Sequence, residues 1–190
     1  GHAAFVDGVP ELVQEYAKTM ETLSLHHYPT SVCRGKPTPP ISDLLEEANS
    51  GQSAQRYLSD IAACRAAGIP FVLGEANSCS CGGAHGLSDV FASTLWGVAW
   101  SLGFTNLSAH HMNFHGGTHG WYTPLAFTPG SNVPTVRPLY YAMWLVSEAT
   151  ANNARLLDVS VSTTLTNVVA WALRDTKNVT RVVIVHKQLE

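Results

Sequence analysis

Glu75 is the residue whose position most clearly suggests chemistry. It directly follows an apolar stretch at residues 71–74 without polar alternation, the pattern of a strand buried on both faces. A carboxylate at such a position loses hydration and needs a partner or a chemical task. At a strand end it could attack the anomeric carbon of a sugar, as in a retaining glycosidase, where a second carboxylic acid lies roughly 5–5.5 Å away. A glutamate that caps a helix or ties a loop would have the same sequence context, so both interpretations stand.

Polar residues also follow the two neighbouring predicted strands. His27 and Tyr28 end the strand predicted at 23–28, and a histidine-rich segment ends the one predicted at 107–115. Between them, Gly82 and Gly83 lie in a loop at 78–86, where backbone N–H groups without side chains could approach an anion closely. A plain tight turn is the alternative for this loop.

Metal binding is the competing interpretation of the histidines. Five of the nine fall between His85 and His119, and His111, His115 and His119 have the spacing of metal ligands on a helix. Glycines at 116 and 117 argue against a helix, and on a strand the first two of these histidines share a face. A polar lining of a sugar pocket is therefore favoured, and no metal is expected.

The aromatic residues fall into two groups, one expected in the core and one expected near a pocket. Trp96, Trp100 and Trp144 lie on predicted helical faces and are expected in the core. Trp121 and Tyr122 follow a strand end in a loop, which makes them the better candidates for a pocket.

The elements that must position these residues alternate between helix and strand. Helices are predicted at 10–20, around 44–45, at 53–67, from an N-cap at Ser88 through residue 102, and from 138 to 147. Such alternation with buried strands indicates an α/β layer or barrel, with ligands at the carboxyl ends of the strands. After a composition shift near 151–153, β-rich segments at 156–161, 168–173 and 182–185 predict an antiparallel sheet, and the shift predicts a domain boundary.

The composition and charge of the chain argue against several classes of binding partner. Of the 190 residues, 45% are hydrophobic and 13% charged, and the net charge is −3, which fits a globular core rather than a disordered or coiled-coil chain. No basic cluster favours nucleic acid, and no apolar run is long enough for a membrane span. Phosphate-loop and dinucleotide fingerprints are missing, so no cofactor is expected. No feature of the sequence predicts an oligomeric state.

Cysteines and sequons favour secretion. Four cysteines occur without a C-x-x-C pair, and Asn106 and Asn178 each begin an N-x-S/T sequon. A secreted glycoprotein is expected, with any signal peptide removed or upstream. Four buried free thiols in a cytosolic domain are the alternative.

The series of motifs that resembles a known family consists of HHY at 26–28, LGEANS at 73–78, GGA at 82–84 and SDVFA at 88–92. In this order they are similar to glycoside hydrolase family 79, which contains heparanase and microbial β-glucuronidases. VRPLYY at 136–141 resembles the helix that leads out of the family's barrel. The resemblance spans about residues 20 to 150.

The resemblance implies a fold. Family members combine a (β/α)₈ barrel with a β-sandwich, so residues 1–151 would form roughly the last three βα units of a barrel. Residues 152–190 would begin an antiparallel β-sandwich domain. Only about three of eight strand–helix units can be counted, so the chain is expected to be part of a larger enzyme.

The resemblance also assigns tasks to residues. It makes Glu75 the nucleophile, Gly82 and Gly83 the loop that holds the glucuronate carboxylate, and His27 and Tyr28 the pocket wall. Tyr122 would face the same carboxylate. The family's acid/base is a Glu preceded by Asn; this chain has no Asn-Glu dipeptide, so the acid/base is expected outside it and the chain alone is expected to be inactive.

Neighbouring βα loops of such a barrel are adjacent in space, which gives the cysteines a pairing. Cys33 follows one strand, and Cys79 and Cys81 follow the next, so a Cys33–Cys81 bridge is expected, with Cys33–Cys79 nearly as good. Cys64, on a predicted helix face, is expected to be buried.

Three functions therefore follow from the sequence. The leading hypothesis is retaining hydrolysis of β-glucuronides or glucuronate-containing glycans by the parent protein. The second is a sugar-binding or degenerate family member that has lost its chemistry, and the third is a histidine-ligated metalloenzyme.

Overall fold

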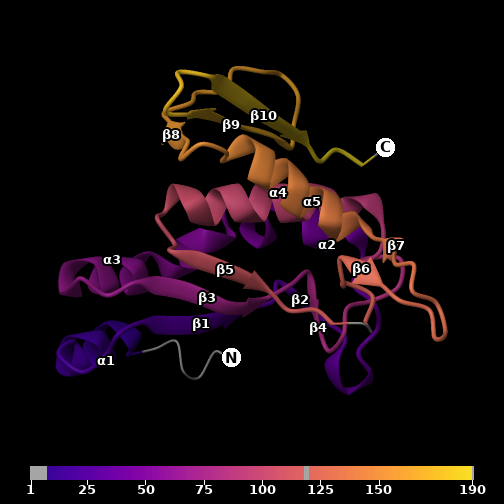
Figure 1. Cartoon of the computed structure of the whole chain (residues 1–190), viewed down its shortest axis with the longest axis horizontal. Coiled ribbons are helices and arrows are strands. Elements are labelled where there is room, and N and C mark those ends of the chain that lie inside the picture. The colour runs from indigo at the N-terminus through magenta and orange to yellow at the C-terminus, as the bar shows by residue number, and fades with distance from the viewer. Residues whose placement is uncertain (1–7, 118–119, 190) are drawn as a thin grey trace.

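The computed structural model describes residues 8–117 and 120–189 and shows a mixed α/β fold (Figure 1). Its centre is a parallel sheet in the order β1-β3-β5, formed by Leu23–His27, Phe71–Ala76 and His111–Phe114. The three strands predicted from the sequence are thus confirmed. The third is shorter than predicted, since Ser108 has a left-handed φ of 66° and residues 107–110 form a turn instead.

Helices connect these strands and cover one face of the sheet. They are α1 (Val9–Tyr16), α2 (Ile41–Leu45), α3 (Leu58–Ala67), α4 (Phe91–Asn106) and α5 (Pro138–Ala149), with 3₁₀ turns at Cys33–Gly35, Glu47–Asn49 and Ser53–Tyr57. Short strand pairs β2–β4 (Thr30–Ser31 with Cys79–Ser80) and β6–β7 (Leu125–Ala126 with Thr135–Val136) lie in the loops. The helix predicted at 53–67 therefore starts as a 3₁₀ turn.

The start of α4 corrects one expectation. Its N-cap position is Val90, not Ser88, and no side chain caps it. The Ser88 hydroxyl instead accepts a hydrogen bond from the Ala84 amide at 3.1 Å and one from the Ser78 hydroxyl at 2.9 Å. Ser88 thus ties the glycine-rich loop to the end of β3.

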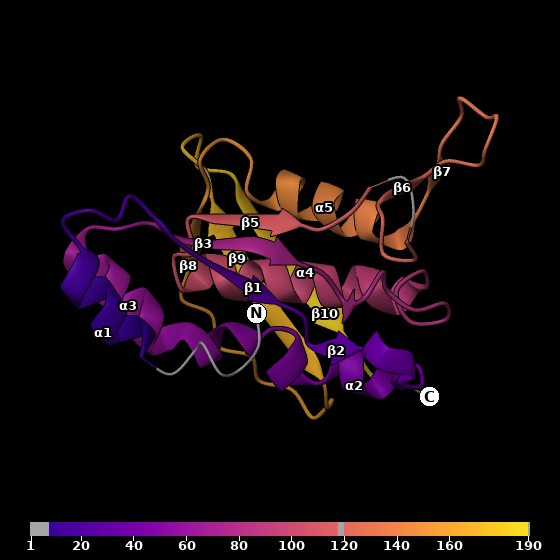
Figure 2. The same cartoon turned by 90° about the horizontal axis from the view of Figure 1, so that it is seen from below.

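The core gathers around α4. This helix is apolar on all sides, as expected for a helix buried between two layers. Trp96, Trp100 and Phe104 are fully buried, and Phe114 of β5 packs against the two tryptophan rings. Seen from below, the parallel strands lie in front of α4 and strands β9 and β10 lie behind it (Figure 2).

Two glycines allow α4 to approach its neighbours closely. A Cβ at Gly97 would lie 2.7 Å from the Ala142 Cβ of α5, and a Cβ at Gly103 would collide with the carbonyl oxygen of Gly51. α4 therefore touches α5 through small residues and touches the loop before Ser53–Tyr57 through backbone.

An antiparallel sheet follows, in the order β10-β9-β8, from strands β8 (Arg155–Leu157), β9 (Val168–Arg174) and β10 (Thr180–His186). It packs against α4 and α5 through β10 (Figure 1). Lys187, just past β10, is 2% exposed and forms an ion pair with Glu47 and a 2.7 Å hydrogen bond with Ser50. β8 is shorter than the predicted 156–161.

Among the residues that the structure describes, no helix combines the length and apolarity required to cross a bilayer.

Candidate active site

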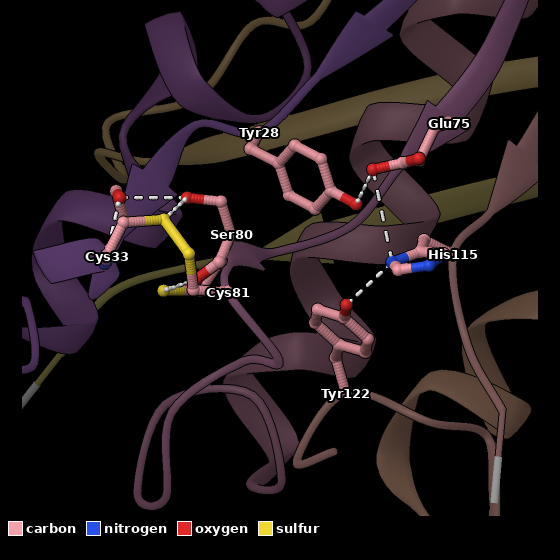
Figure 3. The surroundings of a disulfide bond; sticks show 9 residues. Tyr28, Cys33, Glu75, Ser80, Cys81, His115 and Tyr122 are labelled. Atoms are coloured by element: carbon pink, nitrogen blue, oxygen red, sulfur yellow. Dashed lines mark hydrogen bonds and ion pairs between the residues drawn. A yellow bond between two sulfur atoms is a disulfide. The ribbon is translucent and has the colours of Figure 1, made fainter. Parts of the chain in front are cut away.

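A pocket of about 800 Å³ opens at the carboxyl ends of β1 and β3. Glu75, Tyr28, Gly82 and Tyr122 line it, as the sequence predicted. Figure 3 shows the Tyr28 ring between the Glu75 carboxylate and Cys33, with Tyr122 and His115 on the adjoining wall. Loops that follow three parallel strands thus meet in one hollow.

Glu75 is held by a set of polar side chains. The Tyr28 hydroxyl donates a 2.6 Å hydrogen bond to Glu75 Oε1. His26 Nδ1 lies 3.8 Å from Oε2 and His115 Nδ1 lies 3.9 Å from Oε1 (Figure 3). The Glu75 side chain remains 32% exposed, so the carboxylate is oriented by its neighbours and the side chain is still open to a ligand.

These neighbours set the charge of the site. The hydrogen bond from Tyr28 lowers the pKa of Glu75, and the two histidines act in the same direction, while partial burial opposes them. The pKa of Tyr28 is raised, mainly by burial and also by its bond to the carboxylate. Glu75 is therefore ionised and Tyr28 protonated at neutral pH, which suits a nucleophile and its hydrogen-bond donor.

An irregularity in the sheet brings Glu75 to this position. The β1–β3 register shifts between Leu25 and His26, so that Leu25 pairs with Leu73 but His26 pairs with Glu75. Gly74 is passed over, and a side chain there would collide with Ser24 of β1. The glycine thus permits the close approach that turns the glutamate toward the pocket.

The glycine-rich loop forms a further part of the pocket wall. Cys81, Gly82 and Gly83 follow one another with positive φ values of 66°, 93° and 78°. The Trp121 amide donates a 2.7 Å hydrogen bond to the Gly82 carbonyl, and a Cβ at Gly83 would lie 2.9 Å from the Tyr122 amide nitrogen. Gly82 reaches the pocket, whereas Gly83 is buried beneath it and allows the two loops to interlock.

A disulfide joins the loops after β1 and β3. Cys33 is bonded to Cys81, with Cα atoms 5.3 Å apart, and both residues line the pocket. Beside the bridge, the Ser80 hydroxyl donates to the Ser31 hydroxyl at 2.8 Å. Cys79, the alternative partner, is a buried free thiol, as is Cys64, and burial raises the pKa of both.

His27 does not reach the pocket, contrary to the sequence-based expectation. It is 3% exposed, lies against α4 and shares a 3.0 Å hydrogen bond between its Nδ1 and the Tyr57 hydroxyl. Burial lowers its pKa to about 3, so the ring is neutral. His26 lines the pocket in its place. The signal was present, because residue 27 is in phase with the apolar Leu23 and Leu25, and alternate residues of a strand share a face.

His115 is a pocket residue that the sequence indicated only loosely. Its Nδ1 shares a 2.7 Å hydrogen bond with the Tyr122 hydroxyl, which links the third strand end to the loop after it. In residues 8–117 and 120–189, no three histidine, cysteine or acidic side chains are grouped as metal ligands. His119, the third member of the predicted metal set, lies outside the described residues.

The Tyr28–Glu75 hydrogen bond yields a pH prediction. In the complete protein, Tyr28→Phe removes the main cause of the lowered Glu75 pKa, so the pKa moves up towards its ordinary value. For a reaction that requires the ionised carboxylate, the acid limb of kcat/KM against pH should then shift to higher pH. The rate at the optimum should fall about tenfold to a hundredfold, the usual range for a hydrogen bond to a charged group.

The matched control is Tyr140→Phe, which removes a hydroxyl from an exposed position on α5. Its acid limb should coincide with that of the wild type. An unmoved limb in the Tyr28 variant would show that this hydroxyl does not govern the ionisation of the reacting group.

A polar pocket with an oriented carboxylate at the ends of parallel strands is the arrangement in which α/β proteins bind and process small molecules. Comparisons with known proteins show which α/β proteins this chain is similar to. No family profile matches the chain. The chain is 35% identical over 83 residues to a β-glucuronidase of Aspergillus niger, an alignment that covers 42% of this chain and 15% of that enzyme.

A solved structure is similar over nearly the whole chain. It is a 4-O-α-L-rhamnosyl-β-D-glucuronidase from Fusarium oxysporum 12S in complex with Rha-GlcA, with a TM-score of 0.76 and 20% identity. The match covers 97% of this chain and 38% of that one, so the chain spans well under half of each relative. The chain is therefore distantly related to β-glucuronidases of the family 79 type, and its fold corresponds to part of one.

Proposed function

We propose that the protein containing this chain is a retaining glycoside hydrolase that acts on β-glucuronides or glucuronate-containing glycans. The observation that carries the proposal is the Glu75 carboxylate. It is ionised and accepts a hydrogen bond from the Tyr28 hydroxyl. Two histidines flank it, and it is open to a pocket at the ends of parallel strands. Similarity to β-glucuronidases in sequence and fold supports the choice of sugar.

The proposal includes an architecture. β1, β3 and β5 with their helices correspond to roughly the last three βα units of a (β/α)₈ barrel in residues 1–151. The antiparallel sheet of β8–β10 corresponds to the first strands of a β-sandwich in residues 152–190. Support comes from the parallel order of the first sheet, the change to antiparallel pairing after α5, and the extent of the Fusarium match.

The chemistry has two displacement steps. A Glu75 oxygen attacks the anomeric carbon as the bond to the aglycone oxygen breaks, and a second carboxylic acid gives that oxygen a proton. The same group then takes a proton from water as the water oxygen attacks the anomeric carbon and the bond to Glu75 breaks, which releases the sugar with retained configuration. Glu75 is the one carboxylate among the described residues that line the pocket, so we expect the acid/base to come from residues outside this chain.

We assign the glucuronate carboxylate to the part of the wall that Gly82 and Tyr122 form. Gly82 borders the pocket without a side chain, and the Tyr122 hydroxyl lies beside it on the interlocked loop. Burial raises the pKa of Tyr122, which keeps the hydroxyl protonated and able to donate to an anion. Gly83 contributes by letting the two loops approach.

We also propose that the protein is secreted. The Cys33–Cys81 bridge and the two sequons, at Asn106 and Asn178, fit an oxidising compartment and glycosylation. The proposed ligand is a glucuronate-bearing carbohydrate, without nucleic acid, membrane or cofactor.

Trapping of the covalent intermediate tests the proposal. The complete protein is incubated with a 2-deoxy-2-fluoro-β-glucuronosyl fluoride, which forms the glycosyl-enzyme and hydrolyses slowly. We expect a peptide with the added sugar mass at Glu75, and NMR of a substrate reaction should show the β-anomer forming first. Glucuronide binding without label or turnover would instead identify a sugar-binding member without catalysis. Stoichiometric metal whose removal abolishes activity would identify a metalloenzyme.

A further inference from the structure

A second concave site lies where the end of α4 meets strand β9, and it shares no lining residue with the candidate active site. This α4–β9 groove has a volume of about 270 Å³. Its walls come from the last turn of α4, the loop at 51–55 and the first half of β9. Because α4 lies between the parallel and the antiparallel sheet (Figure 1), an occupant of the groove would touch both parts of the fold.

Asn106 borders the groove and is also the first residue of a sequon, Asn106-Leu107-Ser108. It is the last residue of α4, and both Asn106 and Ser108 are exposed. Within residues 8–117 and 120–189, the Asn106 side-chain amide forms no hydrogen bond. Its nitrogen is therefore free to carry a sugar, directly at the edge of a groove that could receive one.

The walls of the α4–β9 groove combine an aromatic ring with polar amides. Trp171 of β9 is half-buried, and its ring lies over Gly51, where a Cβ would be 3.5 Å from the ring carbon Cζ2. Val161 adds exposed apolar surface, and the side chains of Gln52 and Gln55 are exposed. A sugar ring has apolar C–H faces and hydroxyl edges, so apolar side chains with amide donors and acceptors around them form a surface that fits it.

Volume and charge narrow the kind of occupant. The volume is just below the roughly 300 Å³ at which sites for drug-sized ligands begin, so the groove fits the first sugar or two of a chain. Glu47 is the one charged residue among the described residues of the lining, and it is paired with Lys187. A neutral sugar attached to Asn106 suits such a groove, since attachment gives it a high effective concentration there.

The other sequon provides a comparison within the same chain. Asn178 lies in the turn between β9 and β10, is exposed and has a left-handed φ of 62°. Its amide nitrogen donates a 3.1 Å hydrogen bond to the Asp175 carbonyl, which closes the turn. Asn178 does not border the α4–β9 groove, so a glycan there would extend into solvent.

We propose that Asn106 carries an N-linked glycan whose first sugars lie in the α4–β9 groove against Trp171 and join α4 to the antiparallel sheet. In the transfer, the Asn106 amide nitrogen attacks the anomeric carbon of an oligosaccharide held on a lipid diphosphate. The C–N bond forms as the bond to the diphosphate oxygen breaks, and the amide gives one proton to a base of the transferase. The inference rests on the proposed secretion, which brings the chain to such a donor, and not on the proposed substrate.

The test uses the complete protein, secreted from a eukaryotic host, and a peptide N-glycosidase that releases the glycan and converts the Asn that carried it to Asp. Mass spectrometry of the peptides then measures release at each sequon. In the folded protein, we expect release at Asn178 to be about tenfold faster than at Asn106 or more, because the groove must open before cleavage there. After unfolding in denaturant, the two rates should be similar.

Variants separate the glycan from the side chains around it. Asn106→Gln removes the attachment site but keeps a good helix former, and it should lower the Tm by about 2–4 °C. Asn178→Gly is the matched control, because it removes the other glycan and glycine adopts the left-handed φ readily; its Tm should stay close to that of the parent. Trp171→Leu should raise release at Asn106 towards the rate at Asn178.

The possible outcomes decide between the proposals. A bare Asn106 beside a glycosylated Asn178 would overturn the inference, and so would equal release from both sites in the folded parent protein, whether or not the Trp171 variant is secreted. Glycan on neither residue would contradict the proposed secretion and the inference together. Hydrolysis of an aryl β-glucuronide, measured on the same samples, reports on the proposed catalytic function separately.

Discussion

Replacing Glu75 with Gln in the complete protein should abolish glucuronide hydrolysis, with a fall in kcat of about 10⁴-fold or more. The amide is isosteric and can still accept the hydrogen bond from Tyr28, so the pocket should stay intact. It cannot attack the anomeric carbon as a carboxylate does, because the amide is uncharged and a poor nucleophile. Initial rates on an aryl β-glucuronide, with binding measured in parallel, separate lost chemistry from lost affinity.

Chemical rescue of a Glu75→Ala variant by a small anion provides the control for this experiment. Azide or formate at high concentration can enter the space next to a truncated Glu75→Ala side chain and act as the nucleophile. Restored turnover with an inverted azide product places the missing group at the anomeric carbon. Wild-type rates in the Gln variant would show that another residue attacks the sugar.

Gly103→Ala should have the largest effect on stability, with a loss of about 3 kcal/mol in the free energy of unfolding. Its methyl group would collide with the backbone carbonyl of Gly51, and backbone cannot rotate away as a side chain can. The gain in helix propensity, roughly 1 kcal/mol, offsets only part of this cost. Urea unfolding of the complete protein, followed by tryptophan fluorescence, measures the change.

Gly97→Ala, on the same helix, is the matched comparison. Its Cβ would lie 2.7 Å from the Ala142 Cβ, a side-chain contact that Ala142→Gly removes. We expect the double variant to recover stability, and no single side-chain truncation to rescue Gly103→Ala. A neutral Gly103→Ala would mean that α4 lies further from the Gly51 loop than the structure places it.

The fold was predictable to the extent that it depends on local pattern. The parallel sheet was inferred from the unbroken apolar run before Glu75, and the antiparallel sheet from the spacing of the β-rich segments after residue 155. The contacts between side chains were harder to predict from the sequence. Ser88 has the sequence context of an N-cap, yet its hydroxyl accepts hydrogen bonds from the Ala84 amide and the Ser78 hydroxyl. These contacts depend on a loop conformation that the local sequence does not determine.

The candidate site was predictable where chemistry and topology coincide. Glu75, Tyr28, Gly82 and Tyr122 meet in the pocket because loops after neighbouring parallel strands share one edge of the sheet. His26 rather than His27 faces the pocket because side chains alternate along β1, which puts His27 on the buried face with Leu23 and Leu25. Arg34 and Lys36 also line the pocket. The sequence did not indicate them, since an isolated cation in a loop is most often only solvated.

The bridge between Cys33 and Cys81 also makes a covalent ring of the chain between them. The two cysteines are 48 positions apart, and closing a ring of that size removes about 4 kcal/mol of conformational entropy from the unfolded chain, in the polymer description of disulfides. The ring encloses β3 and Glu75, so unfolding cannot fully separate the strand that carries Glu75 from the loop beside Tyr28. Active-site loops are usually the first part of an enzyme to open; here reducing conditions, rather than heat alone, should decide when they do.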